Sequence, residues 1–219
     1  VIWVHFAGWP CEMDAILSLA RINKIKVIED CAQAHGARYR GRSVGSLGDI
    51  AAWSFCQDKV MTTGGEGGMV TTNNATLWEK MWSFKDHGKS YNAVHKSNHK
   101  PGHRWVHSSF GNNFRMTEMQ AVLGRMQLNL LTEWRHKRFQ NSKIIKDVCL
   151  KFSSLRVPFF SCDGCNKGCA NDGSIEVGCN NAYYKLYVFV NEDKLKVGWS
   201  RDKIVSALKR RHVPCIQGG

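Results

Sequence analysis

The sequence predicts an α/β fold, followed by a small α+β domain at its C-terminal end. Short apolar segments alternate with helical segments over residues 1–72, as in a parallel or mixed sheet that is covered on both faces. A long helical region then leads into a strand and a last helix. We therefore expect one domain over residues 1–145 and a partial second domain over residues 146–219. The 219 residues, 43% of them hydrophobic, are enough for one or two cores.

The first half of the chain supplies four expected strands and two expected helices. Apolar residues at helical spacing predict helices over Glu12–Ile22 and Asn74–Phe84. Val1–Phe6 has no basic leader and is interpreted as a buried strand rather than a signal peptide, so we expect the chain to begin inside a domain. The further strands are expected at Lys26–Glu29, Ile50–Phe55 and Met69–Thr72.

The second half begins with a polar stretch, residues 86–112, that predicts a long loop of the kind that is often functional. Thr117 to Gln120 fits a capping box, and helical spacing follows it to Leu130. A second helical stretch is expected over about 135–152. An irregular insertion is expected over 161–181, then a strand at Ala182–Val190 and a helix at Ser200–Arg211.

Positive charge is concentrated in one part of the chain. The formal net charge is +13, and residues 85–156 hold 14 Lys and Arg against 4 Asp and Glu, a net +10. Such a block is typical of a solvated surface, of a site for an anionic small molecule, or of a nucleic-acid interface. No recognition-helix or zinc-finger spacing accompanies it. No run of apolar residues approaches the length of a membrane span.

Four of the nine cysteines are grouped in the expected insertion. Cys162, Cys165, Cys169 and Cys179 supply four thiols in a Gly- and Asn-rich loop. Four thiols are the ligand set of a structural zinc or an iron–sulfur cluster, but the spacing is not a standard one, and an accidental cluster in a surface loop gives the same pattern. The other five are dispersed in apolar surroundings, and a reducing cytoplasm is expected.

An acidic pair ends the second expected strand. Glu29 and Asp30 follow an apolar segment, and Gln33 and His35 come directly after them. Ligands of open α/β sheets bind at the carboxyl ends of strands, which is where this pair lies. A structural alternative is that Asp30 only caps a following helix.

A lysine follows the third expected strand. Ser54 ends the strand, Lys59 comes five residues later, and a glycine-rich turn over 64–68 follows. Glycines allow the backbone to approach a ligand closely, although the spacing differs from a P-loop. The alternative is a surface lysine beside a flexible hairpin.

Together the two segments indicate pyridoxal phosphate (PLP). Its chemistry needs a lysine amine, a carboxylate beside the pyridine nitrogen and donors for the phosphate. Lys59, Asp30 and Ser54 supply these groups.

Several segments, in the same order, resemble the DegT/DnrJ/StrS-type nucleotide-sugar aminotransferases. The resemblance covers nearly the whole chain except about 161–180. It rests on VIEDCAQAHGA, VGSLGDIAAWSF, DK followed by TTGGEGGMV, the stretch GNNFRMTEMQA that begins at Gly111, and AYYK at Ala182.

The resemblance implies an aspartate-aminotransferase-like fold (PLP fold type I), here truncated at the start of the large domain, in a cytoplasmic homodimer of polysaccharide biosynthesis. Lys59 falls on the lysine that carries PLP, and Asp30 on the partner of the pyridine nitrogen. The resemblance further places Gln33 beside the phenolic oxygen of the cofactor, Ser54 at its phosphate, Asn113 at the phosphate of the neighbouring subunit, and His87 and Arg115 near the substrate.

The implied reaction moves an amino group from glutamate to PLP and then to a keto group on a nucleotide-linked sugar. Some relatives dehydrate sugars instead and carry His in place of the lysine, so Lys59 favours transamination. A non-catalytic basic module that binds nucleic acid is the alternative from another class. Two departures from the family stand out: Cys56-Gln57-Asp58 precedes Lys59 where relatives carry a small or prolyl turn, and Asn181 stands where a His is common.

Overall fold

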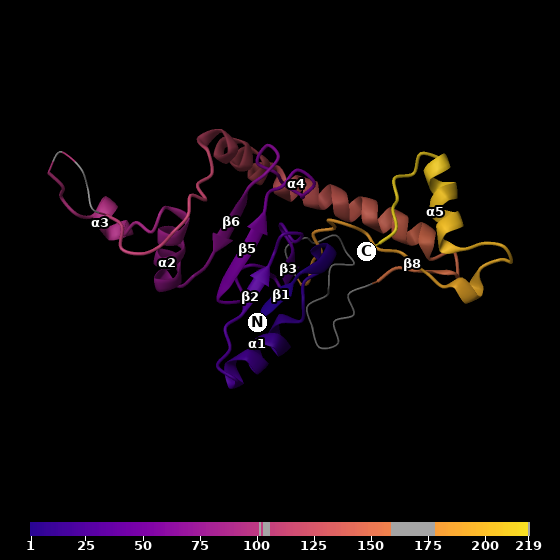
Figure 1. Cartoon of the computed structure of the whole chain (residues 1–219). Helices are drawn as coiled ribbons and strands as arrows, with labels where there is room; N and C mark the ends of the chain where they lie inside the picture. Colours follow the sequence, from indigo (N-terminus) through magenta and orange to yellow (C-terminus); the bar gives the residue numbers. More distant parts are fainter. Residues whose placement is uncertain (101, 103–105, 159–177, 219) are drawn as a thin grey trace.

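A computed structural model describes residues 1–100, 102, 106–158 and 178–218 (Figure 1). Its central element is a four-stranded mixed sheet in the order β1-β2-β5-β6. Strands β1 (Ile2–Val4), β2 (Ile28–Asp30) and β5 (Ile50–Ser54) are parallel, and β6 (Gly68–Thr71) returns antiparallel to β5. The expected mixed α/β sheet is confirmed.

Helix α1 (Met13–Ile22) packs against the first half of the sheet. Its buried residues Met13 and Ala20 share a core cluster with Val27, Tyr39 and Cys179. A second cluster, around Cys31, Ala51 and Ala182, lies beside it. Residues 179 and 182 therefore join the C-terminal part of the chain to both clusters.

The first strand is present as predicted, but the prediction that it is buried is wrong. Ile2, Trp3 and Val4 are all exposed, and β1 pairs only with β2. The reason is that β1 is an edge strand of this sheet, so its other side has no neighbouring strand within the described residues.

Helix α4 (Glu118–Cys149) is one continuous helix of 32 residues, where the sequence predicts two helical stretches. In Figure 1 it runs above the sheet, with α1 below. The predicted capping box is present: Oγ1 of Thr117 accepts from the Gln120 backbone N–H, and the Gln120 side chain bonds back to Thr117 N–H. The proposed division after residue 145 falls inside α4 and remains a prediction.

The remaining elements are short, and several were not expected. Strands β3 (Arg38–Tyr39) and β4 (Arg42–Ser43) form a hairpin, and β7 (Leu155–Arg156) pairs antiparallel with β8 (Phe189–Val190). Only the last two residues of the predicted strand Ala182–Val190 are therefore strand. The helices α2 (Ala75–Lys85), α3 (Tyr91–His95) and α5 (Arg201–Arg210) and two 3₁₀ turns, η1 (Phe6–Gly8) and η2 (Glu192–Lys194), complete the described residues.

None of the helices in the described ranges is both long and apolar enough to cross a lipid bilayer.

Candidate active site

The predicted site begins with a tight loop, residues 55–67, which we call the lysine loop. It is closed on itself, because Thr63 donates from its backbone N–H to Phe55 O at 3.2 Å and from Oγ1 to Glu66 O at 2.9 Å. Gly67 has φ +158°, and a Cβ there would lie 2.1 Å from Oγ1 of Thr63. The loop can therefore close so tightly only with glycine at this position.

The lysine loop is also tied to helix α4. Thr62 N–H donates to Oε1 of Gln127 at 2.8 Å, and Nε2 of Gln120 donates to Glu66 O at 2.8 Å. Gly124 lies at the contact, since a Cβ there would be 2.9 Å from Cγ2 of Thr63. The first third of α4 thus fixes the loop from outside.

Lys59 lies in this loop with its side chain 15% exposed. Its Nζ is 3.5 Å from Oδ1 of Asp58 and 5.0 Å from the ring centroid of Tyr184. Burial acts to lower the pKa of the Lys59 ammonium, but the negative charges that Tyr184 and Asp58 can carry outweigh it, so this pKa is raised above its ordinary value.

Asp58 holds more partners than Lys59 alone. Its carboxylate accepts from the Cys56 thiol at 2.9 Å and from the Tyr184 hydroxyl at 2.5 Å. These hydrogen bonds, that from Cys56 first, and the charge of Lys59 lower the pKa of Asp58 to about 2. This arrangement was not predicted from the sequence; the acidic residue next to Lys59 and the two tyrosines of AYYK are the signals that could have indicated it.

Asp30 and Ser54 end two adjacent parallel strands. Asp30 is paired in register with Ala52 of β5, so Ser54 lies two residues further along the same edge of the sheet. Oδ1 of Asp30 accepts from Ala32 N–H at 3.0 Å. This bond closes a turn and not a helix, because residues 31–37 contain no helix, so the helix-cap alternative is wrong.

Gln33 and His35 lie in the turn that follows β2. Oε1 of Gln33 accepts from Ala7 N–H at 2.7 Å, which orients the amide group. His35 is 2% exposed, and its ring packs against Trp53 and Phe55. Burial, assisted by the charge of Lys59 and opposed by the Ser54 backbone, lowers the pKa of His35 to about 4. The ring centroids of His35 and Phe55 lie 5.8 Å apart, which places the start of the lysine loop beside the turn after Asp30.

The other three predicted residues, His87, Asn113 and Arg115, form a separate group together with Asp86, which we call the His87–Arg115 cluster. The Arg115 guanidinium bonds Nε2 of His87 at 3.2 Å, Oδ1 of Asn113 at 2.9 Å and Oδ1 of Asp86 at 3.5 Å. Asp86 is buried and was not predicted. Burial acts to raise its pKa, but Lys89, Arg115 and Lys85 outweigh this and lower it.

The two groups are not joined within one chain. In the described ranges, none of the hydrogen bonds or ion pairs of the His87–Arg115 cluster reaches Lys59, Asp30, Gln33 or Ser54. His87, Asn113 and Arg115 are all exposed on the connection between α2 and α4. The structure thus brings the predicted residues together in two sets.

Glu29, the other half of the acidic pair, is turned away from this edge. It is fully buried and accepts hydrogen bonds from His5 Nε2 and from the backbone N–H groups of Gly45, Leu47 and Gly48, at 2.6–3.0 Å. Burial acts to raise the pKa of Glu29, but these hydrogen bonds outweigh it and lower it. Glu29 therefore holds the 45–48 loop to the sheet.

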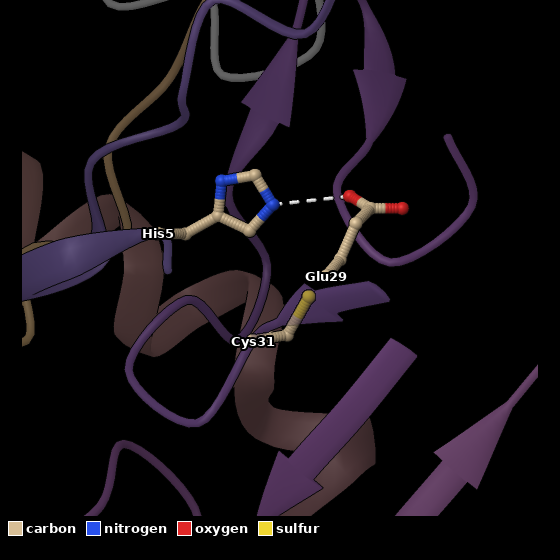
Figure 2. A group of neighbouring side chains, drawn as sticks. All are labelled: His5, Glu29 and Cys31. Carbon is tan, nitrogen blue, oxygen red and sulfur yellow. Dashed lines mark hydrogen bonds and ion pairs between the residues drawn. The ribbon is translucent and has the colours of Figure 1, made fainter. Parts of the chain in front are cut away.

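Figure 2 shows that Cys31 lies beside His5 and Glu29. The possible metal-ligand atoms of these three side chains all lie within 4.8 Å of one another. The donors are already in use, however. Both carboxylate oxygens of Glu29 accept hydrogen bonds, and Nδ1 of His5 accepts from Cys11 N–H at 3.0 Å while Nε2 bonds Glu29. Desolvation also raises the pKa of the Cys31 thiol. The group is a structural network and does not fit a metal.

Of the four cysteines proposed as metal ligands, the structure describes only Cys179. Cys162, Cys165 and Cys169 lie outside the described residues. Cys179 is buried in the core with α1, and its sulfur accepts from Arg40 N–H at 3.3 Å.

The architecture is that of the PLP-dependent aminotransferases of fold type I. The family model of the DegT/DnrJ/EryC1/StrS aminotransferase family matches residues 1–215, so the chain belongs to this family. This finding supports the expected enzyme over the non-catalytic module.

Three relatives illustrate the likeness. The aminotransferase structure from Psychrobacter cryohalolentis superposes with a TM-score of 0.90 at 55% identity, over 99% of this chain and 53% of that one. GDP-perosamine synthase of Escherichia coli O157:H7 is 39% identical over 67% of this chain and 37% of its own length. dTDP-3-amino-3,4,6-trideoxy-alpha-D-glucose transaminase of Streptomyces venezuelae is 36% identical over 62% of this chain and 32% of its own length.

The chain thus spans about half or less of the length of these relatives.

The polar groups of Asp30, Gln33 and Ser54 that make no hydrogen bond in the structure fit the polar groups of PLP. Of the polar atoms described here, Oδ2 of Asp30, Nε2 of Gln33 and the hydroxyl proton of Ser54 take part in no hydrogen bond, although each side chain is oriented through another atom or contact. A carboxylate, an amide donor and a hydroxyl donor are the partners needed by a pyridine nitrogen, a phenolic oxygen and a phosphate. The amine of Lys59 completes the set.

Proposed function

We propose that Lys59 carries PLP and that the protein transfers an amino group from glutamate to the keto group of a nucleotide-linked sugar. One observation supports this most: the Lys59 amine lies in a closed loop beside the sheet edge where Asp30, Gln33 and Ser54 keep unused polar groups. The names of the relatives, a GDP-sugar and a dTDP-sugar enzyme, support the class of substrate.

Each residue at the edge has a separate task in this proposal. When bound, PLP supplies an electron sink for the bond changes at the amino-bearing carbon. Asp30 holds a proton on the pyridine nitrogen, and its bond from Ala32 N–H fixes the carboxylate for this task. Gln33 donates to the phenolic oxygen and Ser54 to the phosphate. Nζ of Lys59 holds the cofactor and, when released, accepts and returns the substrate proton.

The His87–Arg115 cluster has the chemistry of an anion site. It combines an arginine, a histidine and an amide on an exposed connection, held in place by the buried Asp86. We assign His87 and Arg115 to the substrate and Asn113 to the cofactor phosphate. Because the cluster makes no bond with Lys59 of its own chain, we propose that it serves the site of a second copy in a homodimer, in the cytoplasm.

Trapping of the cofactor tests this function. The protein, at the full length that its gene encodes, is incubated with PLP, reduced with borohydride, digested and mapped by mass spectrometry. We expect a pyridoxyl group on Lys59 and none in Lys59→Ala, because Lys59 follows the strand whose end carries the predicted phosphate contact Ser54.

Asp30→Asn is the matched variant, because it changes the electron sink but not the amine. It should keep the adduct on Lys59 and lose transamination by roughly a hundredfold or more, the scale of losing a positioned proton-holding group. An adduct on other lysines alone, or a folded Lys59→Ala variant with an unchanged adduct, would show that the assignment of Lys59 is wrong.

A further inference from the structure

A carboxylate lies beside Lys59 that the proposed function leaves without a role. Asp58 stands directly before the lysine in the sequence. Its carboxylate meets three groups at once: the Cys56 thiol, the Tyr184 hydroxyl and the Lys59 ammonium. An exposed carboxylate with so many partners has a fixed position, unlike a solvated surface aspartate.

Tyr184 is itself held firmly by two other parts of the chain. The preceding residue, Tyr183, has φ +50°, a left-handed conformation that residues other than Gly, Asn and Asp seldom adopt. Its N–H donates to Oδ1 of Asn181 at 2.7 Å, its carbonyl accepts from Arg138 of α4 at 3.1 Å, and Ala182 N–H donates to Gly8 O at 3.0 Å. The strained backbone is thus supported on both sides and directs Tyr184 at the lysine loop.

We propose that Asp58, held by Tyr184, is a positioning residue that fixes the Lys59 amine in the loop and sets the pH at which this amine becomes uncharged. The inference rests on the proposed role of Lys59 as the reactive amine. It adds a second residue, Asp58, that controls the charge of this amine, and Asp58 is itself held by Tyr184, 126 residues further along the chain.

The direction of the effect follows from the charges around Nζ. A neighbouring anion stabilises the ammonium form, so Asp58 keeps Lys59 charged to a higher pH. The neutral His35 contributes no charge of its own, and Lys185 lies on the ring of Tyr184 at 5.5 Å. The titratable groups that face Lys59 are Asp58 and Cys56 from its own loop, Tyr184 and Lys185 from the segment 181–185, and His35 from the turn after β2.

The test is the pH dependence of Lys59 labelling in the cofactor-free protein, at the full length that its gene encodes. Trace acetic anhydride reacts only with uncharged amines, and peptide mass spectrometry gives the rate at Lys59 alone. We expect Asp58→Asn to move the labelling midpoint to lower pH, so that Lys59 is labelled roughly three- to tenfold faster at a fixed pH below the midpoint. Asp58→Glu, which restores the charge, should return the midpoint toward that of the unchanged protein.

Asp202→Asn is the matched control. Asp202 is an exposed aspartate on α5, paired with Arg201, so its substitution removes one negative charge without touching the lysine loop. Its labelling midpoint should match that of the unchanged protein. An unshifted midpoint in Asp58→Asn, or an equal shift in Asp202→Asn, would overturn the inference. Neither result depends on PLP, so the borohydride experiment judges the proposed function separately.

Discussion

Two neighbouring carboxylates, Glu29 and Asp30, show how a single step along a strand changes the role of a residue. Successive side chains of a strand point to opposite faces. Glu29 is consumed by four hydrogen bonds inside the protein, whereas Asp30 makes one and keeps an oxygen available at the sheet edge. The sequence predicts the pair, but only the backbone determines which carboxylate is structural.

Substitution of Glu29 tests its structural role. In Glu29→Gln one oxygen becomes an amide that faces backbone donors, so we expect the free energy of unfolding to fall by about 3 kcal/mol at pH 7, as for a broken buried network. Urea denaturation measures it. Glu79→Gln, on the exposed face of α2, should change stability little.

The pH dependence of this stabilisation has a definite sign. The folded pKa of Glu29 lies below its ordinary value of 4.5, so its contribution is complete above 4.5 and is lost as the pH falls through the folded pKa. The gap in stability between the unchanged protein and Glu29→Gln should therefore narrow below pH 4.5. A gap that stays constant down to pH 3 would contradict this role of the carboxylate.

At the scale of elements, the sequence predicts where helix α4 begins but not that it is one continuous helix. The Thr117–Gln120 box lies where it was predicted. The interruption predicted after Leu130 is absent. Arg135, in the middle of the helix, is buried and packs against Gly36, where a Cβ would lie 2.5 Å from Cδ of Arg135. A buried charged residue breaks the apolar period on which the prediction of a helix depends.

The cap of α4 is also testable. Thr117→Ala removes the acceptor for Gln120 N–H and should lower the free energy of unfolding by about 1 kcal/mol. Thr132→Ala, at an exposed position within the same helix, should be neutral or slightly stabilising because alanine has the higher helix propensity. Urea denaturation of both variants gives the comparison, and an equal loss in both would argue against the cap.

The segment 182–190 shows why extended structure is harder to predict than helix. It is rich in aromatic and β-branched residues, as is typical of a strand, but Ala182 and Lys185 bond the turn at Ala7 and Gly8 instead of a neighbouring strand. Only Phe189 and Val190 find a ladder partner, in β7. Strand formation depends on distant partners, which the local pattern does not contain.

For the whole molecule, the sequence predicts the α/β class, and it indicates Asp30, Ser54 and Lys59 because strand ends and tight turns are local features. The other candidate site residues were expected from the family resemblance: Gln33, His87, Asn113 and Arg115. The sequence does not predict that the site residues divide into the set around Lys59 and the His87–Arg115 cluster. That division arises from the connection between α2 and α4 and leads to the proposed homodimer.

Mixed dimers test this assembly. If Asn113 serves the Lys59 of its partner, mixing inactive Lys59→Ala with weakly active Asn113→Ala gives dimers in which one site carries both substitutions and the other carries neither. We expect transamination to rise on mixing toward roughly a quarter of the unchanged rate, since random pairing makes half of the dimers mixed, each with one intact site. Activity that stays at the average of the two variants would place Asn113 and Lys59 in one subunit.

The contact between Asp58 and Tyr184 also bears on how the protein is made. The two residues are 126 positions apart, so on the ribosome the lysine emerges well before the tyrosine that helps to fix its neighbour. At ordinary elongation rates this interval is roughly ten seconds. During this interval the nascent lysine loop lacks the contact with Tyr184, and the amine acquires its final environment only after Tyr184 has been translated.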